Sequence, residues 1–220
     1  MHMVRRRRRT TETTQLEILQ AAEQLFAEKG FAETSLSAIA ERAHVAKSLI
    51  HHHFGSKEEL WGQVKKTHMR DYQALRHRLI AENGHGTADI GAAIRAHFAF
   101  LSDRPRMVRI FGWMMLETLG EEYAELGGDL IKLAAAALQR AQDAGRIRQD
   151  FQPVFAVLTF VSATEHWLRV REKLAPTLLN VDLKTADDWF VGNLVDIIVH
   201  GVNPTTPVTP DALTDAPAQA

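Results

Sequence analysis

Three consecutive histidines, His51, His52 and His53, are the first candidates for chemistry in this sequence. Imidazole groups can bind a metal, act as a pH switch or meet a polyanion. On a helix, consecutive side chains project about 100° apart, so the three rings cannot converge on one ion. Helical metal sites use histidines at i and i+4, a spacing that these residues lack. The sequence therefore predicts no metal site and no cofactor at this position.

The neighbours of the histidines predict how they are presented. Ile50 and Phe54 lie four residues apart and mark the inward face of a short helix, so Ser48 and His52 point outward. A second short helix and a tight turn precede it. This arrangement is typical of a helix-turn-helix, whose second helix enters the major groove of DNA. A small helical subdomain with solvated polar residues would have the same spacing, so that alternative stays open.

The next residues, Gly-Ser-Lys-Glu-Glu, predict the start of a longer helix. Ser56 and Glu59 form an S-x-x-E capping box. Lys57 lies at the positive end of the helix dipole, where its charge is slightly unfavourable unless an anion is bound nearby. One interpretation is a phosphate-binding site at this helix N-terminus, and the simpler alternative is a solvent-exposed lysine in the first turn.

A dense basic block stands at the start of the chain, although the net charge of the 220 residues is only −1. It consists of five consecutive arginines: Arg5, Arg6, Arg7, Arg8 and Arg9. The block is either a disordered, solvated tail or an arm that follows a nucleic-acid backbone, and it can be both if it orders on binding.

The rest of the composition excludes several classes of site. The chain has no cysteine, which excludes disulfides, thiolate zinc sites and a thiol nucleophile. No apolar leader follows the arginines, and no stretch is long and apolar enough to span a membrane. We therefore expect a cytoplasmic protein.

Apolar spacing predicts an all-α fold without strands. The first helix is closed by Gly30, the second is capped by Thr34 or Ser35, and the third ends near His53. A fourth helix, from about 57 to 83, is roughly 40 Å long and can belong to two domains. A bundle of about five further helices follows, with Pro105 at one start, Gly127-Gly128 as a break, and segments near 129–144, 153–176 and 186–200, the last capped by Thr185 with Asp188.

Residues 16 to 60 closely resemble the DNA-binding domain of TetR-family transcription regulators. The resemblance rests on the helix ending in EKGF, on the T-S-x-x-x-I-A-E-x-A run and on the H-F-x-S-K-E-E-L run. The rest of the chain matches that family in its helix plan only. The resemblance implies a homodimer that places one third helix per subunit in the major grooves of a palindromic operator in double-stranded DNA.

By position, the resemblance assigns base or groove contacts to Lys47, Ser48 and His51, and phosphate contacts to Thr34, His52, His53 and Lys57. It divides the chain into a basic arm (1–12), a helix-turn-helix domain (13–60), a ligand-binding and dimerisation domain (61–202) and a disordered tail (203–220). The family usually has Gly at position 44 and Tyr at position 51, where this chain has His44 and His51. We therefore expect His44 in a left-handed turn conformation.

The second domain is expected to bind an unknown small molecule between its helices. Candidate pocket residues are aromatic, methionine or ionisable side chains at helical spacing: His97, Phe98, Leu101, Phe111, Trp113, Met114, Met115, Glu117, Glu165, His166 and Trp167, with Arg109 as a candidate attractor of an anionic ligand. Such residues are more often plain core. The last two helices are expected to form the dimer face through Phe155, Leu158, Trp189, Leu194, Ile197 and Ile198.

The leading functional hypothesis is a repressor that a small molecule releases from its operator. Activation by the ligand is an alternative within the same fold. A remote alternative is a helical hydrolase using Ser162, Glu165 and His166, but no Gly-rich turn beside Ser162 offers an oxyanion hole, so we expect no enzymatic activity. A nonspecific DNA-binding protein is disfavoured by the near-neutral net charge.

Overall fold

The computed structural model describes residues 10–82, 90–117 and 121–202, and every element in these ranges is helical. The helices are α1 (Thr11–Glu33), α2 (Leu36–Ala43), α3 (Lys47–Phe54), α4 (Lys57–Glu82), α5 (Ile90–Ser102), α6 (Pro105–Glu117), α7 (Glu121–Asp143), α8 (Pro153–Leu174), a π-helical turn η1 (Ala175–Leu179) and α9 (Leu183–Val202). The all-α prediction is confirmed for this part of the chain.

Several predicted features lie outside the described residues. They are the end of the chain from residue 203, the Gly84–Gly86 stretch and the basic arm, which comprises Arg5, Arg6, Arg7, Arg8 and Arg9. The DNA contact expected of these five arginines therefore stays a prediction from the sequence.

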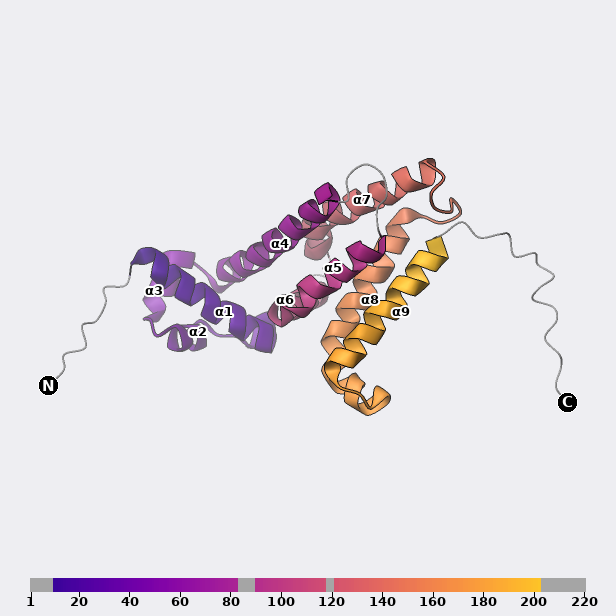
Figure 1. Ribbon diagram of the computed structural model, residues 1–220. Coiled ribbons are helices and arrows are strands. Elements are labelled where there is room, and N and C mark those ends of the chain that lie inside the picture. Colours follow the sequence, from indigo (N-terminus) through magenta and orange to yellow (C-terminus); the bar gives the residue numbers. More distant parts are fainter. Residues whose placement is uncertain (1–9, 83–89, 118–120, 203–220) are drawn as a thin grey trace.

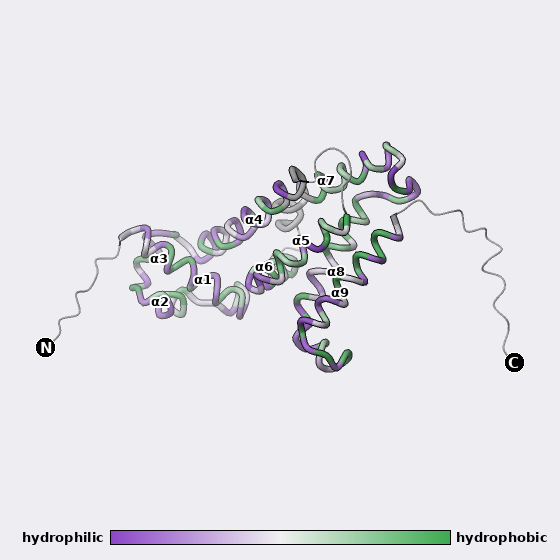
Figure 2. The backbone as a smooth tube through the Cα atoms, in the orientation of Figure 1, coloured by the Kyte–Doolittle hydropathy of each residue, from purple (hydrophilic) through white to green (hydrophobic). Residues whose placement is uncertain are grey.

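The molecule is elongated, with α1, α2 and α3 at one end and α8 and α9 near the other (Figure 1). Helices α4 and α6 extend from the small end into the larger helical body. Hydrophobic and hydrophilic residues alternate along the helices (Figure 2). None of the described helices is long and apolar enough to cross a membrane.

Local capping signals position the first helices as expected. The Ser35 hydroxyl accepts a hydrogen bond from the Ala38 amide and caps α2. At the start of α4, the Ser56 amide donates to a Glu59 carboxylate oxygen at 2.7 Å, and the Glu59 amide donates to the Ser56 hydroxyl at 3.0 Å. These two bonds are the predicted capping box, which satisfies two backbone amides at the start of α4.

The turn between α2 and α3 has the predicted left-handed residue. His44 has φ 53° and ψ 44°, and its amide donates to carbonyls at the end of α2. Residues other than Gly are uncommon in this conformation, although His adopts it more often than most, as Asn and Asp do. The chain keeps the geometry of this turn although it lacks the glycine that would relieve it.

The prediction that Gly30 ends the first helix is only partly right. Gly30 leaves the helical conformation, with φ 76° and ψ 179°, but helical residues resume and run to Glu33. A Cβ at Gly30 would stand 3.0 Å from the indole of Trp113 in α6. Gly30 is therefore both a kink in α1 and a point of close approach between distant segments.

Three other predicted boundaries were wrong. Helix α7 runs through Gly127 and Gly128, because glycine costs only about 1 kcal/mol in a helix that packing supports. Helix α9 begins at Leu183, and Asp182 caps it by accepting hydrogen bonds from the Thr185 amide and hydroxyl. Pro176 lies inside the π-helical turn that continues α8.

Two apolar cores support the body. The first extends from Ile18 in α1 through Leu60 and Trp61 in α4 to Phe111 and Met114 in α6. It continues across the expected boundary at residue 60, so the small end is packed onto the larger body and is not tethered by a linker. The second core joins α5, α7, α8 and α9.

Candidate DNA-binding site and its surroundings

Helix α3 presents a polar outer face over a single buried anchor. Ile50 is fully buried in the first core, and Lys47, Ser48, His51 and His52 are exposed. The structure thus brings the three residues predicted to contact bases, with His52, to one open face of an eight-residue helix. An exposed helix of this kind fits the width of a major groove.

The orientation of His51 is set by its own helix. Its Nδ1 lies 2.8 Å from the carbonyl oxygen of Gly55. Because a carbonyl can only accept, Nδ1 carries the proton, and in the neutral ring Nε2 holds a lone pair. The ring is exposed, so Nε2 can accept a hydrogen bond from a partner such as an exocyclic amine of a base.

Thr34 and Lys57 have roles that differ from the predicted phosphate contacts. The Thr34 side chain is buried, and its hydroxyl donates within the domain, at 2.7 Å from the Gly30 carbonyl oxygen. The Lys57 ammonium donates to the carbonyls of Phe31 and Thr34, at 2.7 and 2.9 Å, and lies 4.1 Å from the centre of the Phe31 ring. At the C-terminal end of α1, Lys57 thus supplies a donor to two carbonyls, of which the Phe31 carbonyl also accepts from the Thr34 amide. The structure therefore corrects the predicted phosphate contact of Thr34, because the Thr34 hydroxyl faces the interior of the domain.

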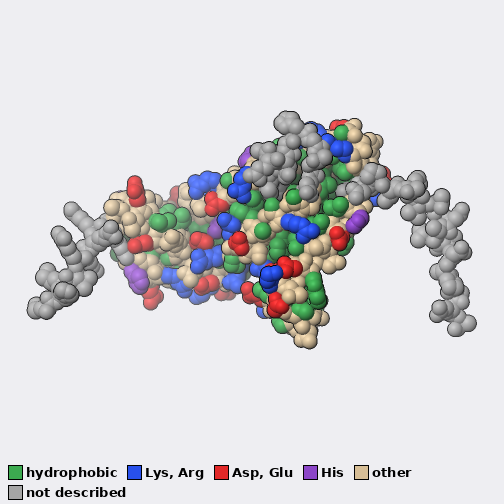
Figure 3. Space-filling model, viewed as in Figure 1, with side chains coloured by type: hydrophobic (Ala, Val, Ile, Leu, Met, Phe, Trp, Pro, Cys, Tyr) green, Lys and Arg blue, Asp and Glu red, His purple; other side chains and the backbone are tan. Residues whose placement is uncertain are grey.

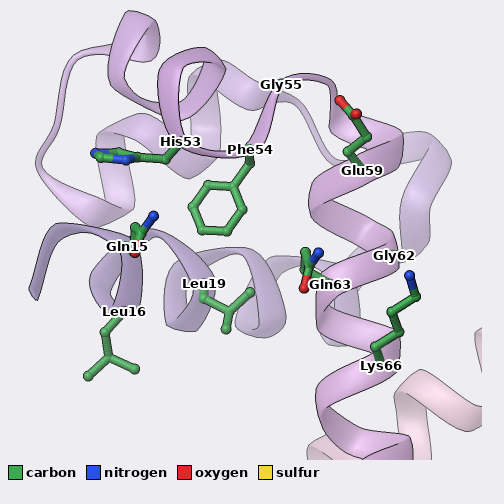
Figure 4. Close-up of a pocket in the computed structure, with 10 residues that line it drawn as sticks. All are labelled: Gln15, Leu16, Leu19, His53, Phe54, Gly55, Glu59, Gly62, Gln63 and Lys66. Carbon is green, nitrogen blue, oxygen red and sulfur yellow. The ribbon is translucent and has the colours of Figure 1, made fainter. Parts of the chain in front are cut away.

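The structure does not bring His53 together with Lys57. Lys57 bonds to the end of α1, whereas His53 lines a groove beside Gln15, near the start of that helix. Figure 4 shows His53 and Phe54 on the α1-facing side of α3, with Gln63 and Lys66 on the α4 side. The groove has a volume of about 840 Å³. His53 is therefore half-buried between α3 and the start of α1, and its phosphate contact remains a prediction.

The candidate ligand residues fall into two groups. His97, Phe98, Leu101, Phe111 and Met114 are buried. The Tyr72 hydroxyl and His97 Nδ1 lie 3.3 Å apart, which gives this buried imidazole a polar partner. These five side chains belong to the interior of the larger body, and an interior ligand site among them remains a prediction.

The remaining candidates do not converge with that interior. Met115 and His166 are exposed, because each follows a buried residue on its helix and so points about 100° away. Trp167 stacks on Phe190 with ring centres 4.9 Å apart and donates to Asp187, so it joins α8 to α9. Glu165 is buried on α8, and the side chain of Glu117 lies outside the described residues. His166 and Met115 therefore do not line an interior site, and Met115 borders an open groove with Arg109 and Trp113 instead.

The residues predicted for the dimer face are partly exposed and partly buried. Phe155, Trp189 and Ile197 are 65%, 52% and 69% exposed, and Leu158 is half-buried. Leu194 and Ile198 are buried in the second core, because they lie on the side of α9 that packs against the other helices. A surface with large exposed apolar side chains on α8 and α9 remains, and such surfaces commonly mark interaction sites.

The sequence does not predict a cluster of three ionisable side chains that joins three helices. Glu23 of α1 lies 3.5 Å from His68 of α4 and 3.9 Å from Arg106 of α6, which joins three helices. Burial lowers the pKa of His68 from the usual 6.5, while Glu23 and Asp71 act in the opposite direction. The three residues are far apart in sequence, so only the helical phase of His68, on the inner stripe of α4, could have indicated an interior position.

The hydrolase alternative gains no support from the geometry. Ser162 and His166 share an exposed face of α8, whereas the Glu165 side chain is buried. A carboxylate turned into the core cannot orient an imidazole on the outside of the same helix. Among the described residues, no group of three ionisable side chains is arranged to hold a metal ion.

Comparison with known proteins matches residues 18–64 to the model described as "Bacterial regulatory proteins, tetR family". The regulator TtgR of Pseudomonas putida is 43% identical over 58 residues, which is 26% of this chain and 28% of TtgR. The repressor Rv3405c of Mycobacterium tuberculosis is 53% identical over 47 residues, covering 21% and 25% of the two chains. The match thus spans about a quarter of the length of these relatives and coincides with the helix-turn-helix region.

Solved structures extend the similarity to the whole fold. The putative transcriptional regulator SCO4942 of Streptomyces coelicolor superposes with a TM-score of 0.67 at 24% identity, over 87% of this chain and 99% of that one. A gamma-butyrolactone receptor superposes with a TM-score of 0.64 at 23% identity, over 93% and 94%. Residues 18–64 therefore match the helix-turn-helix region of the tetR family of bacterial regulatory proteins, and the described chain shares the all-helical fold of these solved structures.

Proposed function

We propose that this chain is a DNA-binding transcription repressor that acts as a homodimer on a palindromic operator. The observation that carries the proposal is α3, anchored by Ile50 and presenting Lys47, Ser48, His51 and His52 on one open face. Two similar proteins, Rv3405c and KstR2 of Rhodococcus jostii, are named as transcriptional repressors. KstR2 is 24% identical over 70% of this chain and 77% of its own length. The base contacts assigned to α3 are part of this proposal.

The homodimer would pair through α8 and α9. Exposed Phe155 on α8 and exposed Trp189 and Ile197 on α9 supply the apolar side chains that a two-fold interface needs. The Arg171 guanidinium pairs with Asp187 and also donates to Ser102, which holds α9, α8 and α5 as one unit. A rigid pair of helices suits an interface that sets the distance between two α3 helices, roughly 34 Å for adjacent turns of DNA.

The proposed signal is a small apolar molecule bound inside the larger body. Buried aromatic, methionine and leucine side chains lie in the body with one buried histidine, His97, and this mix of apolar and polar groups is typical of ligand sites. Two structural neighbours are named for such molecules, a gamma-butyrolactone receptor and the ketosteroid regulator KstR2 of Mycobacterium tuberculosis. Helix α4 begins beside α3 and is packed in the same core as α6, so a change in the body would reach the recognition helix.

A gel-shift titration against DNA flanking the chain's own gene tests the proposal. The expected result is that a fragment with one palindrome is retarded in the gel even in the presence of excess random duplex. His51→Ala and His52→Ala should both weaken binding, but only His51→Ala should relax the preference among bases at one position of each half-site. Equal affinity of the wild-type protein for random duplex would contradict operator recognition.

A further inference from the structure

A second groove lies where α1, α6 and α8 meet, away from the α3 surface and from the buried core. It has a volume of about 510 Å³ and is bordered by Ala27 and Glu28 of α1, by Arg109, Trp113 and Leu116 of α6, and by Arg169 of α8. In the space-filling view, Lys and Arg side chains gather over the region where α1 and α6 meet (Figure 3). The groove is thus shared between the DNA-binding end and the larger body.

One side of this groove is apolar and firmly held. Leu116 is 72% exposed and Met115 is 43% exposed, which is unusual for large apolar side chains in a region rich in charge. The Trp113 indole packs closely against Gly30, and its Nε1–H donates to the Ala27 carbonyl at 3.4 Å. An apolar molecule would therefore meet a preformed wall, which lowers the entropy cost of binding.

The other side carries two guanidinium groups that are not neutralised. Arg109 and Arg169 are exposed, and neither makes an ion pair or hydrogen bond within the part of the chain that the structure describes. The acidic residue of the groove, Glu28, is paired with Arg42 at 3.2 Å. Arg169 reaches across α6 above Gly112, where a Cβ would stand 3.3 Å from its guanidinium nitrogen. The glycine leaves room for this arginine beside the apolar wall.

We propose that this groove binds a small amphiphilic carboxylate. The carboxylate would lie between Arg109 and Arg169, which offer planar donor pairs, and the apolar body would cover Leu116 and Trp113. Charge complementarity selects an anion, and the exposed apolar wall selects an anion with a hydrocarbon body. The bound molecule touches α1, α6 and α8 at once, so it ties the helix-turn-helix end to the larger body.

Isothermal titration of the full-length protein with decanoate, decan-1-ol and acetate tests this proposal. Decanoate is expected to bind at least about tenfold more tightly than the alcohol, which lacks the charge, and than acetate, which lacks the body. The double variant R109Q/R169Q should lose about tenfold in decanoate affinity. The matched control R140Q removes an exposed arginine from α7 and should bind as the wild type does.

Leu116→Glu provides a second variant, because it places a negative charge in the groove at a position that is already exposed and so leaves the fold intact. It should also weaken decanoate binding at least about tenfold. Undiminished binding to R109Q/R169Q, or equal affinity for decanoate and the alcohol, would overturn the proposal. Titration without DNA makes this outcome independent of operator recognition, which the gel-shift experiment tests separately.

Discussion

At the scale of single residues, the DNA-facing end separates groups that hold the domain together from groups that face outward. Lys57 belongs to the first kind, since its ammonium satisfies carbonyls of Phe31 and Thr34. Lys47 belongs to the second kind, since it is exposed on α3. Both are lysines at the first position of a helix, so helix position alone does not distinguish them.

Replacing each lysine with alanine should therefore change a different quantity: stability for Lys57 and DNA affinity for Lys47. Lys57→Ala leaves two carbonyls at the end of α1 without a charged donor, and we expect a loss of about 1–3 kcal/mol in the free energy of unfolding. Lys47→Ala should change stability by less than about 0.5 kcal/mol but weaken DNA binding. Urea denaturation and gel shifts measure the two quantities. Equal stability of the two variants would show that the Lys57 hydrogen bonds contribute little.

At the scale of helices, the junction between α1 and α6 depends on one residue without a side chain. Gly30 has a positive φ of 76°, and Trp113 occupies the space that a Cβ would need. Gly128 provides a contrast, because it lies inside α7 and a Cβ there would meet nothing within 4 Å. The same substitution at the two glycines separates backbone strain and crowding from simple helix propensity.

Gly30→Ala should lower the free energy of unfolding by about 2 kcal/mol or more, since strain and the clash with Trp113 add. Gly128→Ala should raise it by about 0.5–1 kcal/mol, because alanine favours the helix and restricts the unfolded chain. Thermal or urea denaturation gives both values. A stabilised Gly30→Ala variant would mean that the kink does not need glycine.

Helices α8 and α9 carry the apolar surface proposed for dimerisation. The double variant Phe155→Glu/Ile197→Glu alters two exposed positions and should leave each subunit folded while converting the dimer to monomer. Leu116→Glu, at an exposed position on α6, is the matched control and should remain dimeric. Sedimentation analysis distinguishes the two states. A dimer that persists in the double variant would place the interface elsewhere.

The sequence predicted those features that are encoded locally. The Ser56–Glu59 capping box, the left-handed His44 and the start of α6 at Pro105 each depend on residues within one helical turn. Features that depend on distant partners were not predicted. Lys57 meets carbonyls 23 and 26 residues away, and the inward orientation of Leu194 follows from packing against other helices. Periodicity alone cannot tell which apolar face of α9 meets the core and which is left exposed.

At the scale of the whole molecule, the two ends are joined by a continuous core and by the cluster of Glu23, His68 and Arg106. The His68 side chain is only 12% exposed and lies between α1 and α6. A change in its charge would therefore act where the DNA-binding end meets the larger body.

This position makes stability depend on pH in a defined direction. Burial lowers the folded-state pKa of His68 below 6.5, so the unfolded chain binds a proton more readily than the folded one. The contribution of His68 to stability is thus complete above pH 6.5 and is lost as the pH falls toward the lowered pKa. His68→Gln keeps a polar side chain that does not titrate, so its unfolding free energy should fall less between pH 7 and pH 5 than that of the wild type. His77→Gln, at an exposed position on the same helix, should retain the wild-type slope. If Glu23 outweighs burial and stabilises the charged imidazole, the wild type would gain stability relative to His68→Gln as the pH falls, and urea denaturation at several pH values distinguishes the two signs.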